Sequence, residues 1–229
     1  MIRVNITAEG FSEERFIEEI LRPHLLAFGV YVEVRKILTN RKLKKRGGMP
    51  SYEKVKNDIK QWIKESPGVW HTTMIDLYGL KNDFPGYSTT SHMRYDSRAA
   101  EIERQFGESI DFHKFIPYIQ LHEYEALLFS DPDKMEEWLG LYNDIPKGCF
   151  RDIRDGFESA EQINDSKQTA PSKRIESIVG KDNYSKVDDG VLILKEIGLE
   201  KIRKECPHFD DWLIRLENLG TTGNDPEEE

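Results

Sequence analysis

The stretch IRVNITAEGFSEERF (residues 2–16) decides the fold class of the chain, because a strand pattern changes into a helix pattern within it. Residues 2–8 alternate and are rich in β-branched side chains, which is typical of a strand. From Ser12 to Phe28 apolar residues recur at helical spacing, with Ser12 as the expected N-cap. The stretch therefore predicts a strand followed by a helix, with Glu9 at the carboxyl end of the strand.

The rest of the first half repeats this alternation. Further strands are expected at residues 30–38, 69–75 and 115–121, and further helices after Ser51 and near residues 96–106. Such alternation implies right-handed crossovers and a mostly parallel sheet covered on both faces by helices. Beyond Glu123 the pattern is helical. We therefore predict an α/β fold, with an α/β domain at residues 1–130, a helical C-terminal portion packed on it at 131–222 and an acidic tail at 223–229.

Composition bounds the class of protein. Of the 229 residues, 38% are hydrophobic, which is enough to bury a core, yet no segment approaches the ~20 consecutive apolar residues of a membrane span. The first residues lack the pattern of a signal peptide, so a cytoplasmic location is expected. Cys149 and Cys206 alone cannot form a disulfide framework or a thiolate zinc site.

The net charge of −9 is unevenly distributed. Residues 1–64 hold 14 Lys and Arg against eight Asp and Glu, whereas the remainder holds 19 against 34. The basic excess centres on Arg41, Lys42, Lys44, Lys45 and Arg46. Such a run is expected either to contact nucleic-acid phosphates or to form a solvated loop.

Carboxylates follow three of the predicted strands. Glu9 follows the first strand, Asp76 the third, and Glu123 and Glu125 the fourth. Because ligands of an open parallel sheet bind at the carboxyl ends of its strands, we expect these side chains to meet at one edge. Clustered carboxylates resist burial unless a cation neutralises them, and oxygen ligands suit Mg²⁺ or Mn²⁺. The pattern predicts a divalent-metal site of the kind that assists phosphodiester chemistry.

Structural interpretations of the same residues remain open. Glu9 would cap the following helix, Asp76 would close an Asx turn, and Glu125 would be the polar start of an apolar helical turn. Other chemistries lack their motifs: the chain has no phosphate-binding loop, no dinucleotide fingerprint and no G-x-S-x-G, and Ala126 breaks the zinc-protease pattern after His122-Glu123.

Several segments resemble known families. Ala8-Glu9-Gly10-Phe11-Ser12-Glu13-Glu14 resembles the opening motif of TOPRIM domains, as found in the overcoming-lysogenization-defect nucleases and the RloB-like proteins. Residues 74–80, 83–86 and 121–129 resemble a narrower group, the bacterial domain-of-unknown-function 4276 family, and this resemblance continues through residues 171–174, 197–199 and 206–209. It covers nearly the whole chain.

The TOPRIM resemblance implies a compact parallel sheet whose strand ends hold divalent metal for strand cleavage or joining. Glu9 matches the family's glutamate, Glu13 the acidic position of the opening motif, and Asp76 the first aspartate of a pair. Position 78 is Tyr where the second aspartate is usual, and Asp83 is inferred to supply the missing ligand. This departure leaves a one-metal or degenerate site open.

The leading hypothesis is a Mg²⁺- or Mn²⁺-dependent TOPRIM-like nuclease. Glu9, Glu13, Asp76 and Asp83 would hold metal, Glu123 or Glu125 would complete its ligands or polarise the attacking water, and Lys186 is a candidate transition-state cation. The residues expected to contact the phosphate backbone of DNA or RNA are Arg41, Lys42, Lys44, Lys45, Arg46, Lys173 and Arg174.

Two other functions are kept as alternatives. One is a non-catalytic partner subunit of an ATPase, since TOPRIM-like proteins of this kind resemble companions of ATPases in anti-phage defence systems. This alternative would be favoured by an apolar surface on the helical C-terminal half, formed by Trp138, Leu139, Leu141, Trp212, Leu213 and Leu216. The expectation that we favour for these six residues is a position in the core. The other is a hydrolase or ligase that acts on a small phosphorylated molecule. This alternative does not explain the basic run at residues 41–46.

Overall fold

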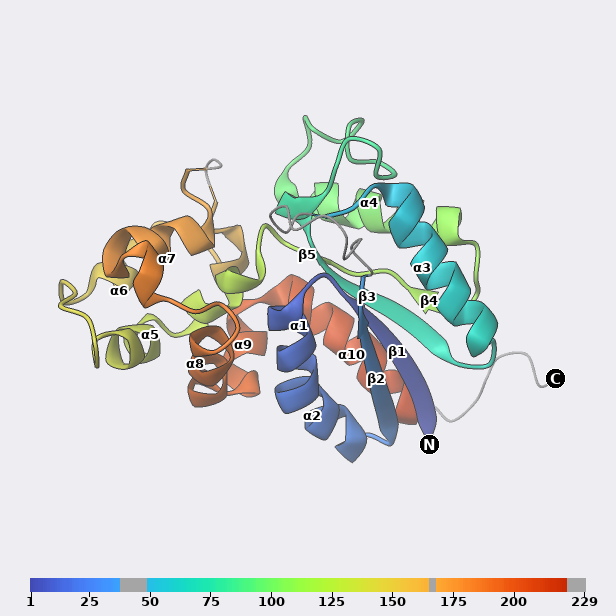
Figure 1. Ribbon diagram of the computed structural model, residues 1–229, viewed down its shortest axis with the longest axis horizontal. Helices are drawn as coiled ribbons and strands as arrows, with labels where there is room; N and C mark the ends of the chain where they lie inside the picture. The colour runs from blue at the N-terminus through green and yellow to red at the C-terminus, as the bar shows by residue number, and fades with distance from the viewer. Residues whose placement is uncertain (38–48, 165–167, 222–229) are drawn as a thin grey trace.

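A parallel sheet forms the centre of the computed structural model, which describes residues 1–37, 49–164 and 168–221. The strand order is β2-β1-β3-β4, with β5 also paired to β3 (Figure 1). The strands are β1 (Ile2–Ala8), β2 (Val30–Lys36), β3 (Trp70–Asp76), β4 (Phe115–Ile116) and β5 (Ile119–Gln120). Every pairing is parallel, which confirms the expected α/β class.

The fourth predicted strand is two short strands rather than one. β4 and β5 are separated by Pro117 and Tyr118, and proline has no N–H to donate to a neighbouring strand. Thr73 of β3 bridges the gap: its Oγ1 donates to the carbonyl of Tyr118 at 2.8 Å and accepts the N–H of Tyr118 at 3.1 Å. The prediction of a continuous strand over residues 115–121 is therefore wrong at Pro117.

Helices cover both faces of the sheet (Figure 1). On one face lie α3 (Tyr52–Glu65) and α4 (Tyr95–Ile110), and on the other α1 (Phe11–Phe16), the π-helix Ile17–Leu21, α2 (Arg22–Ala27) and α10 (Pro207–Thr221). Each face has its own buried cluster: Ile75 and Phe106 belong to the first, Met74 and Phe16 to the second. The alternation of side chains along β3 thus builds both cores.

The first helix begins earlier than expected. α1 starts at Phe11 with Gly10 in the N-cap position, so the expectation of Ser12 as N-cap is wrong. Gly10 has no side chain with which to cap the helix. Glu13 compensates, because its Oε2 accepts the N–H of Gly10 at 2.8 Å.

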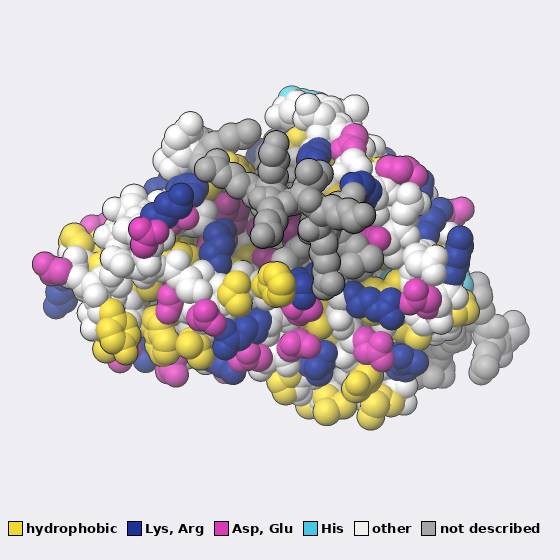
Figure 2. Space-filling view, viewed as in Figure 1, with side chains coloured by type: hydrophobic (Ala, Val, Ile, Leu, Met, Phe, Trp, Pro, Cys, Tyr) yellow, Lys and Arg dark blue, Asp and Glu magenta, His cyan; other side chains and the backbone are white. Residues whose placement is uncertain are grey.

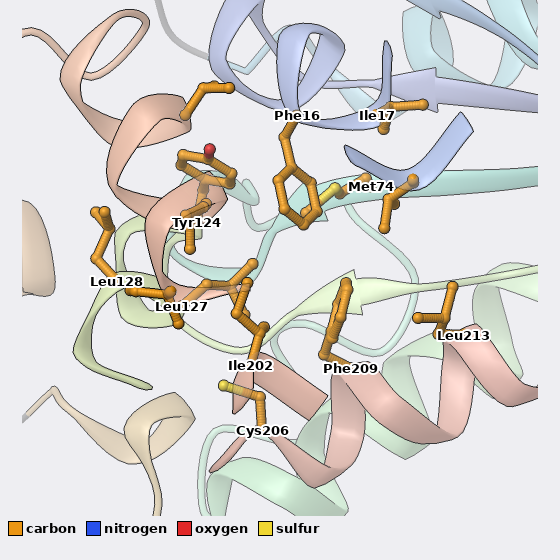
Figure 3. Packing of buried hydrophobic residues seen from close by; sticks show 14 of the residues in the cluster. Phe16, Ile17, Met74, Tyr124, Leu127, Leu128, Ile202, Cys206, Phe209 and Leu213 are labelled. Carbon is orange, nitrogen blue, oxygen red and sulfur yellow. The ribbon is translucent and has the colours of Figure 1, made fainter. Parts of the chain in front are cut away.

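After β5 the chain is helical, as expected. Its helices are the 3₁₀ turns Tyr124–Ser130, Ala160–Gln162 and Lys181–Asn183, together with α5 (Pro132–Leu139), α6 (Cys149–Arg154), α7 (Pro171–Val179), α8 (Asp189–Ile197) and α9 (Leu199–Glu205). They share one buried cluster with β1 and α1, in which Phe16, Tyr124, Ile202 and Phe209 lie together (Figure 3). The helical portion is therefore packed on the sheet through a common core.

The apolar residues of the C-terminal half mostly belong to this core. Leu139, Trp212, Leu213 and Leu216 are buried, and Trp138 packs against the same cluster. Leu141 is exposed. The expectation of a core position is therefore confirmed for all six residues except Leu141. These six described residues do not form the apolar surface that would favour a docked ATPase. Among the described residues, no helix is both long and apolar enough to cross a membrane.

Candidate active site: a carboxylate cluster at the strand ends

The carboxyl ends of β1 and β3 bring Glu9 and Asp76 together. The register pairs Ala8 with Met74, and the N–H of Asp76 donates to Glu9 Oε2 at 3.0 Å. The Glu9 carboxylate also lies against Gly79, where an added Cβ would be 2.8 Å from Oε1. Any side chain at position 79 would therefore displace the carboxylate.

Three further acidic residues surround this pair, and all are nearly buried. Glu13 lies in the first turn of α1, and Glu123 and Glu125 follow β5. Asp76 fixes the start of this last segment, because its Oδ1 accepts the N–H of Tyr124 at 2.9 Å. The structure thus brings carboxylates from three chain segments to one edge of the sheet, as the sequence predicts.

Burial and mutual repulsion raise the pKa values of these groups. Burial, with the charge of Glu13, raises the pKa of Glu9 to about 7, and burial raises the pKa of Glu125 to about 7. The pKa of Asp76 lies well above its ordinary value because of burial and the charges of Glu9 and Glu13. Burial also raises the pKa of Glu13. The cluster is therefore stabilised either by protons or by a nearby cation.

Lys186 supplies one such cation. Its Nζ lies 2.5 Å from Glu125 Oε1, and 45% of its side chain is exposed. Burial lowers the pKa of Lys186, but the charges of Glu125 and Glu123 outweigh this effect, so the net pKa is raised. The side chain is therefore a permanent cation at neutral pH.

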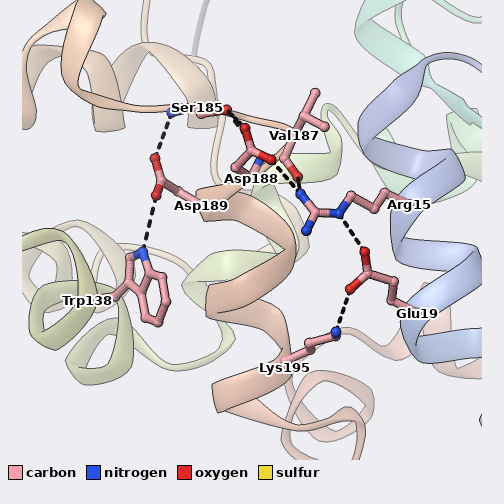
Figure 4. Close-up of polar contacts among 8 residues, drawn as sticks. All are labelled: Arg15, Glu19, Trp138, Ser185, Val187, Asp188, Asp189 and Lys195. Carbon is pink, nitrogen blue, oxygen red and sulfur yellow. Dashed lines mark hydrogen bonds and ion pairs between the residues drawn. The ribbon is translucent and has the colours of Figure 1, made fainter.

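The segment that carries Lys186 is held on both sides (Figure 4). Arg15 of α1 donates from Nη1 to the carbonyl of Val187 at 3.0 Å and pairs with Asp188 Oδ1 at 2.6 Å. On the other side, Asp189 accepts the N–H of Ser185 at 2.8 Å and Nε1 of Trp138 at 3.2 Å. The contact of Arg15 with Asp188 is not predictable from the sequence, because no local pattern links residues that lie 173 positions apart.

Two of the predicted site residues make structural contacts. Asp83 is exposed, and its Oδ2 accepts the N–H of Tyr52 at 3.0 Å, at the first residue of the helix for which Ser51 is the N-cap. Glu123 Oε2 accepts the N–H of Ser172 at 3.0 Å in the first turn of α7. Both carboxylates therefore act as helix-capping acceptors in the structure.

Two buried tyrosine hydroxyls lie beside the acidic cluster. Neither Tyr124 nor Tyr184 has a hydrogen-bond partner for its hydroxyl within the described parts of the chain. An added Cβ at Gly190 of α8 would lie 3.3 Å from the hydroxyl of Tyr184 and 3.5 Å from the ring of Tyr124. After burial, the charge of Glu125 contributes most to raising the pKa of Tyr184. Neither hydroxyl is predicted from the sequence, because a buried aromatic side chain has the same pattern whether or not its hydroxyl has a partner.

The predicted nucleic-acid contacts are only partly described. Arg41, Lys42, Lys44, Lys45 and Arg46 lie outside the described residues. Lys173 pairs with Glu176 at 2.6 Å, and Arg174 donates to the carbonyl of Thr169 at 2.7 Å. Among the described residues on the face in Figure 2, Lys and Arg side chains are interspersed with Asp and Glu rather than gathered in one basic area.

The donor chemistry of the cluster fits a hard divalent cation, because Glu9, Glu13 and Asp76 are carboxylates that repel one another. Their present positions do not converge: within residues 1–37, 49–164 and 168–221, no three His, Cys, Asp or Glu side chains are arranged to hold a metal ion. Each of the three accepts a backbone N–H instead. Binding of a metal would require these carboxylates to turn away from those N–H groups.

The fold and the site define an α/β protein with a carboxylate cluster at the carboxyl ends of parallel strands. The chain belongs to the family described as "Domain of unknown function (DUF4276)", whose model matches residues 8–217. This confirms the narrower resemblance seen in the sequence. Curated proteins gave no match to the chain.

One solved structure is similar to the chain, the C-terminal region of the OLD protein of Xanthomonas campestris pv. campestris. The sequence identity is 13%, the alignment covers 97% of each chain, and the TM-score is 0.34. A TM-score of this size does not by itself establish a common fold.

Proposed function

We propose that the chain is a TOPRIM-like nuclease that hydrolyses phosphodiester bonds with Mg²⁺ or Mn²⁺. The observation that carries the proposal is the carboxylate cluster, in which burial and like charge raise the pKa values of Glu9 and Asp76. Such perturbed groups at the carboxyl ends of parallel strands are typical of functional sites. A bound divalent cation would offset the repulsion.

Glu9, Asp76 and Glu13 are the residues proposed to hold the metal. The hydrogen bond from the backbone N–H of Asp76 to Glu9 Oε2 holds the Glu9 carboxylate at the end of β3, and Glu13 lies in the first turn of the helix that follows Glu9. When bound, the metal lowers the pKa of water and neutralises charge on the phosphate. Asp83 is left out of the proposed ligand set, because it caps α3.

Glu125 and Lys186 are proposed to assist hydrolysis. A pKa of about 7 suits Glu125 to accept a proton from the attacking water. The water oxygen then forms a bond to phosphorus while one P–O ester bond breaks, and the leaving oxygen takes up a proton from solvent water. Lys186 is proposed to stabilise the charge that develops on the phosphate oxygens. Glu123 keeps its contact with Ser172 and so positions α7 beside the site.

The test is cleavage of end-labelled DNA and RNA in Mn²⁺ by the wild type, Asp76→Asn and Asp83→Asn. We expect Asp76→Asn to lose more activity than the 10- to 100-fold that removal of an outer-shell partner of a metal costs. Asp83→Asn retains an acceptor for the N–H of Tyr52 and is expected to cleave like the wild type. Full activity of Asp76→Asn would contradict the proposal, and loss in Asp83→Asn would return that residue to the ligand set.

A further inference from the structure

Two exposed aromatic side chains flank the carboxylate cluster. Phe11 is 65% exposed and lies two residues after Glu9, and Tyr78 is 38% exposed and lies two residues after Asp76. Tyr78 also precedes Gly79, the residue against which the Glu9 carboxylate rests. Phe11 therefore follows β1 and Tyr78 follows the neighbouring strand β3, each two residues after a carboxylate of the cluster.

Both aromatic residues are held in place. Lys36 of β2 lies with Nζ 4.1 Å from the centre of the Phe11 ring, and it also pairs with Glu14. The N–H of Tyr78 donates to the carbonyl of His122 at 2.9 Å. The first contact fixes the Phe11 ring and the second fixes the backbone of Tyr78. An exposed ring that is already fixed, like that of Phe11, loses little freedom when a flat ligand stacks on it.

The placement differs from that of the other exposed aromatic residues. Among the described residues, Tyr31 and Tyr142 are the remaining exposed aromatic side chains. Tyr31 lies near the amino end of β2, opposite the strand-end cluster, and Tyr142 follows α5. Neither is within two residues of a cluster carboxylate, so both serve as matched controls.

We infer that Phe11 and Tyr78 form a stacking pair for unpaired bases, so the substrate class is single-stranded nucleic acid or an unpaired segment. The inference rests on the proposed nuclease function. Bases in a duplex are covered by their neighbours, whereas an unpaired base offers its face to an aromatic ring. With a net charge of −9, the chain has little ionic attraction for phosphates, and stacking supplies affinity that does not depend on charge.

The experiment is fluorescence anisotropy with a labelled 20-nucleotide single strand of dT, a matching strand of rU and a blunt 20-base-pair duplex. Ca²⁺ replaces Mn²⁺ so that the probes are not cleaved. We expect Phe11→Ala and Tyr78→Ala each to weaken single-strand binding about 5- to 150-fold, the range for loss of one stacked base. Phe11→Tyr and Tyr78→Phe should restore it, and Tyr31→Ala and Tyr142→Ala should bind like the wild type.

Two results with the alanine variants would overturn the inference: unchanged single-strand binding in both, or a loss of duplex binding equal to the loss of single-strand binding. A third is the absence of wild-type binding to either single strand at 10 µM protein, a concentration about equal to the dissociation constant of ordinary non-specific binding. Failure of the nuclease proposal looks different. In that case the single strand binds and depends on Phe11 and Tyr78, but no nucleic acid is cleaved in Mn²⁺. A cleaving protein with unaffected alanine variants would refute the stacking pair alone.

Discussion

Glu161 and Asp76 are both buried carboxyl groups, yet they lie in opposite surroundings. Glu161 accepts the N–H groups of His208 and Phe209 with its two oxygens, at 2.9 and 3.0 Å, at the beginning of α10. Burial raises its pKa to about 7, but the nearest charge, that of His208, lowers it. Around Asp76 the charges of four other carboxylates, Glu9, Glu13, Glu125 and Glu123, raise the pKa. The two groups therefore differ in the charges around them rather than in burial, and the proposed metal site rests on the crowding of like charge around Asp76.

Removing Glu161 should destabilise the protein most. Glu161→Ala leaves two buried N–H groups at the start of α10 without an acceptor, and we expect a loss of about 3 kcal/mol in the free energy of unfolding. Urea denaturation measures this loss. Cleavage per folded molecule should not change, because Glu161 lies outside the cluster. A loss below about 0.5 kcal/mol, the size of an ordinary surface substitution, would show that the cap contributes little.

The pH dependence of stability should report the raised pKa of Glu9. Between pH 4.5 and about 7 the unfolded state has released the proton of Glu9 while the folded state keeps it, so stability falls as the pH rises through this window. Relative to Glu9→Gln, the wild type should lose about 3 kcal/mol over the window, as a shift from 4.5 to about 7 implies. Unfolding in chelator at several pH values measures it. Parallel curves for the two proteins would contradict the account.

Asp76→Asn should stabilise the metal-free protein. The amide keeps an acceptor for the N–H of Tyr124 but removes the charge that repels Glu9 and Glu13. At pH 8 in chelator we expect a gain of about 1 to 2 kcal/mol, in line with functional sites that trade stability for activity. Thermal unfolding checks this. A variant less stable than the wild type would mean that Asp76 is a purely structural acceptor, like Glu161.

Arg15→Ala should have the smallest effect on stability. It removes the contacts with Val187 and Asp188 that hold the segment carrying Lys186, and partly exposed contacts of this kind contribute about 1 kcal/mol or less. We expect cleavage to fall about tenfold through misplacement of Lys186, since mispositioning by about 1 Å already costs up to 100-fold. Asp188→Asn retains an acceptor and is the milder control. Equal cleavage by wild type and Arg15→Ala would show that the contacts of Arg15 with Val187 and Asp188 do not position Lys186.

Much of the fold follows from sequence pattern. The repeated alternation of strand and helix patterns over residues 2–121 predicts a parallel α/β sheet with carboxylates at its edge, which the structure confirms. The split of the fourth strand was not predicted, because the apolar run over residues 115–121 continues through Pro117, and the bridge from Thr73 depends on a residue far away in sequence.

The details of the site were less predictable. Sequence identifies which residues are acidic, but it does not reveal which backbone N–H each one accepts. Asp83 and Glu123 turn out to be helix caps, and Glu161 was not considered at all. The contacts of Arg15 with Val187 and Asp188, and the position of the Tyr184 hydroxyl, which has no hydrogen-bond partner among the described residues, depend on tertiary packing of α8 against the first helix. Such contacts leave no periodic signal in the sequence.

The most direct test of the central claim is Mn²⁺ binding measured by titration calorimetry at pH 8. The account predicts that the wild type binds Mn²⁺, that Glu9→Gln and Asp76→Asn each abolish binding, and that Glu161→Gln binds like the wild type. The absence of binding to the wild type, or equal binding by Asp76→Asn, would contradict the claim that the strand-end carboxylates form a metal site.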